Sequence, residues 1–160
     1  MKSGFRLSEI NFKLNNFTQS SKKFFEKKRV TIFSISQKID YQLKNFENNY
    51  DRIKKLGIHE IYYCGLENFA NLKSKFNKIK INNIKILPDE EGIFTEHLGM
   101  LTSKSRDTKK YQGKNYMAII TDGIIEKWWE DIYNSKNIEK DSYITEIKAE
   151  NCLEYLHGTE

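Results

Sequence analysis

The sequence predicts one α/β domain in which a central mixed β-sheet is flanked by helices. A β-branched, apolar run at residues 30–35 (VTIFSI) and a similar run at 60–64 (EIYYC) are separated by an amphipathic stretch. A helical connection of that length typically joins two parallel strands by a right-handed crossover. Residues 116–129 have instead the pattern of an antiparallel hairpin. A chain of 160 residues fits a single domain, 1–160, with a substantial core.

The first part of the chain is predicted to alternate strands and helices. Residues 5–14 alternate enough for a short strand or hairpin arm, and residues 20–27 suit one helical turn. After the strand at 30–35, a helix is predicted over 40–56, because apolar residues recur at three- and four-residue steps: Leu43, Phe46, Tyr50, Ile53 and Leu56. Gly57 is well suited to end that helix.

The middle of the chain continues this alternation. Helical spacing predicts a second helix over 68–80. A short strand is predicted at 84–87, closed by a turn that begins at Pro88, the only proline. Residues 94–100 are predicted to be helical. Residues 102–113 are polar and lack hydrophobic periodicity, so we expect a loop there.

The last part is predicted to be the hairpin at 116–129, built around an Asp-Gly pair, and a helix over 147–156. Trp128 and Trp129 are adjacent on a strand and therefore point to opposite faces. We expect one in the core and the other partly exposed or covered by a partner. The order βαβα, then a hairpin, then a closing helix is the thioredoxin arrangement, and neither a repeat nor a linker interrupts it.

Composition narrows the class of function. No apolar run approaches the roughly 20 residues needed to cross a bilayer, and residues 1–10 lack the apolar stretch of a signal peptide. We therefore expect a soluble, cytoplasmic protein without a membrane partner. The chain has two cysteines, Cys64 and Cys152, and three histidines, His59, His97 and His157. They lack the spacing of a disulfide framework, a redox pair or a metal site, so we expect no metal and no cofactor.

The formal net charge of +5 comes from a high lysine content. A solvated lysine surface is the plain explanation, and a polyanion-binding face is the alternative. The densest cluster consists of Lys73, Lys75, Lys78, Lys80 and Lys85. Because acidic residues are interspersed elsewhere and no recognition motif accompanies the lysines, we do not expect nucleic acid as a partner.

Segments spread over most of the chain resemble the type II (atypical two-cysteine) peroxiredoxins, the peroxiredoxin-5-like members of the redoxin superfamily. The strongest match is IKILPDEEGIFTEHLGMLTSKS at 84–105, where the family has a Leu-Pro/Ser-Asp turn, a Phe-Thr pair and a Leu-Gly-Met-Leu stretch at the same spacing. NYDRIKKLGIHEIY, TDGIIEKWWED and AENCLEYL resemble its helix-to-strand segment, its hairpin and its closing helix. The resemblance implies a thioredoxin-like fold and a homodimer.

That family reduces hydroperoxides with a thiolate placed at the start of the helix that follows the first core strand. A Pro-x-x-x-Thr-x-x-Cys motif and an arginine lower the pKa of the thiol and polarise the leaving oxygen. In this chain SISQKIDY at 34–41 replaces the motif. The resemblance puts the nucleophile position near Ile39 or Asp40 and the arginine on Asn115, with a second arginine on Gln112. We expect Asp40 to be the N-cap of the helix rather than a general base.

Cys64 is the alternative nucleophile. Some family members have a cysteine in the second strand, but it falls on Tyr63, so Cys64 lies on the opposite face. We expect Cys64 and Cys152 to be buried core residues.

Three functions follow from these observations. The first is a peroxiredoxin-like protein that lacks the peroxidatic cysteine, is inactive as a peroxidase and acts as a binding or structural module. Its partner would be a second copy, or a protein or small molecule at the vacated pocket. The second is a divergent thiol oxidoreductase, an antioxidant that uses Cys64. The third is a polyanion-binding module with a lysine-rich face.

Overall fold

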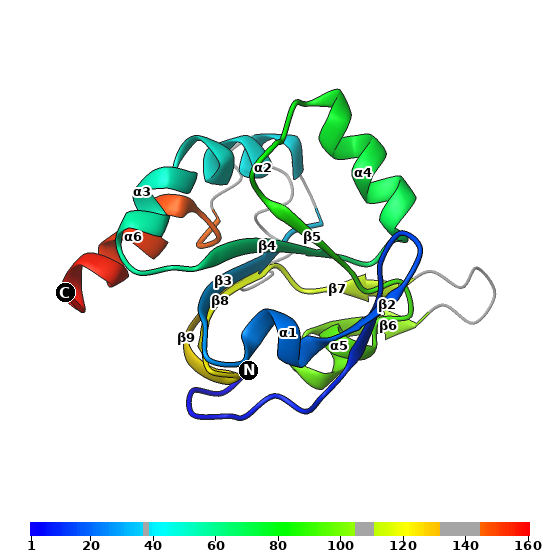
Figure 1. Ribbon diagram of the computed structural model, residues 1–160, viewed down its shortest axis with the longest axis horizontal. Helices are drawn as coiled ribbons and strands as arrows, with labels where there is room; N and C mark the ends of the chain where they lie inside the picture. Colours follow the sequence, from blue (N-terminus) through cyan, green and yellow to red (C-terminus); the bar gives the residue numbers. More distant parts are fainter. Residues whose placement is uncertain (37–38, 105–110, 132–144) are drawn as a thin grey trace, which may run out of the picture.

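The computed structural model describes residues 1–36, 39–104, 111–131 and 145–160. Its centre is a five-stranded sheet with the strand order β5-β4-β3-β8-β9 (Figure 1). These strands are β3 (Arg29–Ser34), β4 (Glu60–Gly65), β5 (Lys85–Pro88), β8 (Tyr116–Thr121) and β9 (Ile124–Glu130). β3 is parallel to β4, as predicted, and β4 is parallel to β5, whereas β8 is antiparallel to both β3 and β9.

Helices cover both faces of this sheet (Figure 1). One face carries α2 (Ile39–Asn48), α3 (Tyr50–Lys55), α4 (Phe69–Lys78) and α6 (Ala149–Gly158). The other carries α1 (Ser21–Phe25), α5 (Ile93–His97) and β1 (Asn11–Lys13), which pairs with β2 (Thr18–Ser20). β6 (Leu101–Lys104) pairs with β7 (Tyr111–Gly113) in a further small sheet.

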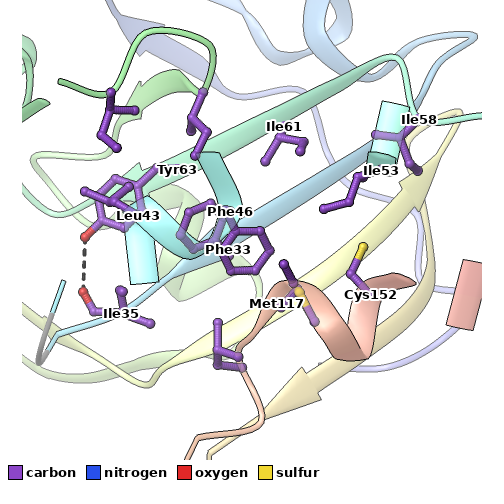
Figure 2. Close-up of a cluster of buried hydrophobic side chains, with 14 of the residues drawn as sticks. Phe33, Ile35, Leu43, Phe46, Ile53, Ile58, Ile61, Tyr63, Met117 and Cys152 are labelled. Carbon is purple, nitrogen blue, oxygen red and sulfur yellow. Dashed lines mark hydrogen bonds between the residues drawn. The ribbon is translucent and has the colours of Figure 1, made fainter. Parts of the chain in front are cut away.

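The sheet separates two apolar cores, which we call the α2 core, beneath α2, and the α1/α5 core, on the opposite face. In the α2 core, the rings of Phe33 and Phe46 stack with their centroids 3.9 Å apart (Figure 2). The Tyr63 hydroxyl donates a hydrogen bond of 3.1 Å to the Ile35 carbonyl oxygen, which ties β4 to the end of β3. The opposite core is rich in rings from α1, α5 and β1, which include Phe25, Phe94 and Phe12.

The helix predicted over 40–56 is in fact two helices. α2 ends at Asn48 and α3 begins at Tyr50, with Asn49 between them at φ −105° and ψ 6°. The Asn49 side-chain amide donates to the Asn45 carbonyl oxygen at 2.8 Å. Such a bond gives the backbone an alternative to a continuous helix. Gly57 follows with a positive φ of 96°, as expected of a residue that ends a helix.

Two further predictions are corrected by the structure. Asp40 lies inside the first turn of α2, so it is not the N-cap of that helix. The loop predicted over 102–113 contains most of β6 and all of β7, because strand pairing there depends on backbone hydrogen bonds and needs no hydrophobic alternation. Residues 105–110 of that segment lie outside the described ranges.

The predicted hairpin is confirmed. Asp122 and Gly123 connect β8 to β9 with φ values of 49° and 75°, the positive values that a type I′ turn requires. Trp128 packs against the α1/α5 core and Trp129 against the α2 core, so the two rings do point to opposite faces. Both are half-buried, so one ring is partly exposed as expected, but the other is not fully buried in the core as expected.

α6 is joined to the sheet by hydrogen bonds that meet at the Glu126 carboxylate. Arg29 donates two of them, from Nε at 3.0 Å and from Nη2 at 2.6 Å. The hydroxyls of Thr121 and Tyr155 donate at 2.6 and 2.7 Å. Tyr155 belongs to α6, so this carboxylate connects the C-terminal helix to β3 and β9.

Replacing Glu126 should therefore cost stability in a pH-dependent way. Burial alone would raise the pKa of this carboxyl, but the bonds from Arg29, Thr121 and Tyr155 outweigh burial and lower it. Because the pKa of Glu126 is lower in the folded than in the unfolded protein, its carboxylate stabilises the fold fully at a pH above the unfolded-state pKa. This stabilisation is lost as the pH falls through the folded-state pKa. We expect Glu126→Gln to lose about 1–2 kcal/mol of unfolding free energy at pH 7 and less in acid.

Urea unfolding at pH 7 and at about pH 3 measures this difference. Glu91→Gln is the matched control, because Glu91 is exposed and its ion pair among the described residues is a weak one, with the exposed Lys13 at 3.4 Å. A loss in Glu126→Gln of the same size at both pH values would contradict the prediction.

No helix within the described ranges is both long and apolar enough to cross a bilayer.

Candidate functional site

The positions that the resemblance assigns to the nucleophile lie just beyond the end of β3. Ile39 and Asp40 form the first turn of α2. Ile39 is half-buried and packs against the α2 core, whereas Asp40 is exposed. Gln37 and Lys38, from the segment that replaces the family motif, lie outside the described residues. The side chains described at the helix start are thus an alkyl group and a carboxylate, and neither is a nucleophile of the thiol type.

Asn115, at the position assigned to the arginine, forms hydrogen bonds with residues from two different segments of the chain. It directly precedes β8 and is 4% exposed. Its Oδ1 accepts hydrogen bonds from the backbone N–H of Ser36 at 2.8 Å and from the Ser36 hydroxyl at 3.1 Å. Its Nδ2 donates to Asp131 Oδ2 at 3.2 Å. The amide therefore bridges the segment after β3 and the residue after β9.

Asp131 extends this bridge to the segment that leads into α6. Its carboxylate accepts from the Thr145 hydroxyl at 2.7 Å and from the backbone N–H of Glu146 at 2.7 Å. We call Ser36, Asn115, Asp131 and Thr145 the polar junction. It contains an amide, two hydroxyls and a carboxylate, and its own four side chains provide no cation for a developing negative charge.

Gln112, the position of the second arginine, is on β7 and is exposed. Its backbone carbonyl oxygen accepts a hydrogen bond from the Thr102 hydroxyl at 3.0 Å. It thus belongs to the small β6–β7 sheet.

Cys64 is 1% exposed and packs in the α1/α5 core. Its neighbour Tyr63 faces the α2 core, so the one-residue offset turns Cys64 away from the start of α2, as predicted. Burial raises the pKa of the Cys64 thiol far above its usual range, and the Asp89 carboxylate adds to that rise. Contacts with the hydroxyls of Tyr116 and Thr95 offset only part of it.

Cys152 is fully buried in the α2 core, on α6 (Figure 2). Its Sγ lies 3.6 Å from the Thr31 hydroxyl. Burial raises the pKa of this thiol to about 11, with the Thr31 hydrogen bond as a partial offset. The two thiols belong to cores on opposite faces of the sheet, and both are free.

A buried carboxylate near Cys64 was not singled out from the sequence. Asp89 is 5% exposed and accepts from the backbone N–H groups of Phe94 at 3.1 Å and Thr95 at 2.7 Å, and from the Thr95 hydroxyl at 2.7 Å. It therefore satisfies free amides at the start of α5. The signal was present in the Asp-Glu-Glu-Gly turn that precedes the Phe-Thr pair.

The lysines of the predicted cluster are all exposed, and they come from α4, from the residue two positions after it and from β5. Lys73, Lys75 and Lys78 are on α4, Lys80 follows that helix with a positive φ of 60°, and Lys85 opens β5. Lys75 pairs with Glu67 at 2.7 Å. Among the residues that the structure describes, no group of three or more His, Cys, Asp or Glu residues is arranged to hold a metal ion.

Comparison with solved structures identifies the fold. Reduced Prx3 from Vibrio vulnificus superimposes with a TM-score of 0.83 at 17% identity, covering 98% of this chain and 99% of that one. Peroxiredoxin 5 from Alvinella pompejana gives a TM-score of 0.80 at 17% identity, with 99% of each chain covered. The central mixed sheet with its helices is thus the thioredoxin-like fold of peroxiredoxins, as predicted.

Comparison of sequences identifies the family. The chain matches no protein-family model. It is 31% identical over 144 residues to peroxiredoxin y4vD of Sinorhizobium fredii, a match that covers 86% of this chain and 76% of that protein. It is 33% identical over 126 residues to a peroxiredoxin of Rhizobium etli, with 75% and 70% covered. With this identity and coverage, the chain belongs to the peroxiredoxin family.

Proposed function

We propose that this peroxiredoxin-family protein has lost the peroxidatic cysteine, does not reduce hydroperoxides through a thiolate, and acts as a binding or structural module. The observation that carries the proposal is that an asparagine, Asn115, occupies the arginine position and is held there by hydrogen bonds. A thiolate peroxidase of this family needs a cationic partner at that position, whereas here a neutral amide forms hydrogen bonds with Ser36 and Asp131.

The two thiols support the same proposal. The thiolate is the nucleophile in peroxide reduction, so a reactive cysteine needs a lowered pKa and access to the peroxide. Cys64 and Cys152 are 1% and 0% exposed, and the pKa of each is raised. Neither lies at the start of α2. Residual thiol chemistry at Cys64 would require the α1/α5 core to open first.

The binding part of the proposal concerns the surface around the first turn of α2. Tyr41 lies in that turn next to Asp40 and is 71% exposed. Exposed aromatic residues are enriched where proteins meet partners. We propose that a second copy of this chain or another protein covers Tyr41. Sedimentation velocity over a range of protein concentrations tests for the second copy, and a sedimentation coefficient that stays at the value of a 19.0 kDa monomer would exclude it.

The absence of peroxidase chemistry is tested by intact-mass measurement during titration of the reduced protein with hydrogen peroxide. We expect no rapid gain of one oxygen and no peroxide consumption, because both thiols are protonated and buried. A double variant, Cys64→Ala with Cys152→Ala, is the control, since the three methionines can also gain oxygen slowly. Fast oxygen addition that this double variant lacks would overturn the proposal.

A further inference from the structure

We propose that a groove along the outer face of α4 binds a small anion that carries adjacent phosphate groups. The groove has a volume of about 590 Å³, within the range of small-molecule sites in proteins. Its walls are formed by α4 and by Asn15, in the turn between β1 and β2. Figure 1 shows this turn beside the lower end of α4. The site does not include the polar junction or either thiol, so it stands independently of the proposed loss of peroxidase chemistry.

The residues that line the groove are basic or neutral, without an acidic member. Lys73 and Lys78 supply the charge, and Asn15, Ser74 and Asn77 supply neutral hydrogen-bonding groups. Both lysines are exposed, and neither side chain forms an ion pair or hydrogen bond with a described residue. Their ammonium groups are therefore free to meet an anion.

The geometry of α4 places the two lysines on either side of a strip of short side chains, which forms the shallow floor of the groove. At 3.6 residues per turn, Lys73 and Lys78 are separated by about 140° around the helix axis. Ala70, Ser74 and Asn77 lie between those two directions, and their side chains are short. A ligand resting on this floor would have a lysine on each side, and Asn15 would face it from the neighbouring turn.

The charged residues of α4 are all positive, which is unusual for a solvent-exposed helix. Solvent-exposed helices usually intersperse both signs, but α4 contains three lysines and no Asp or Glu. Basic residues in the last turn, Lys75 and Lys78, also complement the helix dipole, which explains those two without a ligand. Lys73 precedes that turn, so the dipole does not account for it. Lys75 already has Glu67 as partner and is not part of the groove.

The chemistry of these groups favours a phosphate chain over other anions. Lysine binds phosphate as a compact point charge, and two lysines on either side of one floor match two or more linked phosphates better than one carboxylate. Asparagine and serine side chains donate the neutral hydrogen bonds that phosphate oxygens accept. A nucleoside triphosphate and inorganic tripolyphosphate share this chemistry, and they differ in the nucleoside.

Titration calorimetry with tripolyphosphate and with ATP, at low ionic strength, tests the site. We expect the variant Lys73→Gln with Lys78→Gln to lose at least about tenfold in affinity for tripolyphosphate, since both charged contacts are removed. The matched control is Lys44→Gln with Lys75→Gln, which removes the same net charge from exposed positions outside the groove. Its affinity should stay within about twofold of the wild type. Circular dichroism verifies that both variants are folded.

Amide NMR spectra locate the ligand independently of affinity. Shift changes at Asn15 and along α4 on addition of tripolyphosphate would support the proposal. Tighter binding of ATP than of tripolyphosphate would assign the natural ligand to the nucleotides, and equal binding would assign recognition to the phosphates alone. Equal losses in both double variants, absence of binding, or much tighter binding of single-stranded DNA with a steep salt dependence would overturn the proposal.

Discussion

Iodoacetamide should label both cysteines of the native protein at least about a hundredfold more slowly than it labels the unfolded chain. Alkylation requires the thiolate. Burial raises the pKa of Cys152 from 9.0 to about 11, which by itself lowers the thiolate fraction at neutral pH about a hundredfold. The pKa of Cys64 is raised further, and both side chains are also shielded from the reagent.

Mass spectrometry of samples quenched over time measures the two rates. Cys64→Ala leaves Cys152 as the sole thiol and Cys152→Ala leaves Cys64, so each rate can be assigned. The same proteins in urea provide the unfolded reference. Native labelling of Cys64 at nearly the unfolded rate would contradict its burial and would support the thiol oxidoreductase alternative.

Asn115→Ala should be the most destabilising single change at the polar junction, with a loss of about 2–4 kcal/mol of unfolding free energy. The substitution removes two acceptor bonds from Ser36 and one donor bond to Asp131. The site is 4% exposed, so water would not readily replace those bonds. The Ser36 N–H and the Asp131 carboxylate would each lose a partner at the same time.

Two further substitutions make this test specific. Asn71→Ala changes an exposed asparagine on α4 and should be neutral or slightly stabilising, since alanine favours helix. Asn115→Asp keeps an acceptor for Ser36 but sets a second carboxylate against Asp131. Its deficit relative to the wild type should shrink as the pH falls and one carboxyl is protonated. Urea midpoints measure all three, and a loss below about 1 kcal/mol in Asn115→Ala would show that the amide is dispensable.

Local patterns in the sequence account for most of the predicted elements. Alternation of apolar residues predicted β3 and β4, and the Asp-Gly pair predicted the turn at Asp122. The interruption at Asn49 was not predicted, because apolar spacing continues across it from Phe46 to Tyr50. The β6–β7 pair was not predicted either, because this short two-stranded sheet is mostly polar and lacks a periodic apolar signal.

The candidate site was also predicted only in part. Resemblance to a known family was enough to select Ile39, Asp40 and Asn115 as positions of interest. It did not reveal that Asn115 bonds to Ser36 and Asp131, which lie 79 and 16 residues away in sequence. It also did not reveal the partnership of Asp131 and Thr145, 14 residues apart.

The sequence by itself determined the order of the strands in the central sheet along the chain, the parallel crossover, the hairpin and the family resemblance, because each depends on periodicity or on residues close together along the chain. It also assigned Cys64 to the face opposite Tyr63, since side chains alternate along a strand. Only the tertiary structure decided the partners of Asn115, the core that encloses Cys152, and the groove in which Lys73 and Lys78 are free while Lys75 is paired. The physical reason is that side chains far apart in sequence meet only after the elements pack, and their geometry then decides which polar groups are satisfied and which remain open to a ligand.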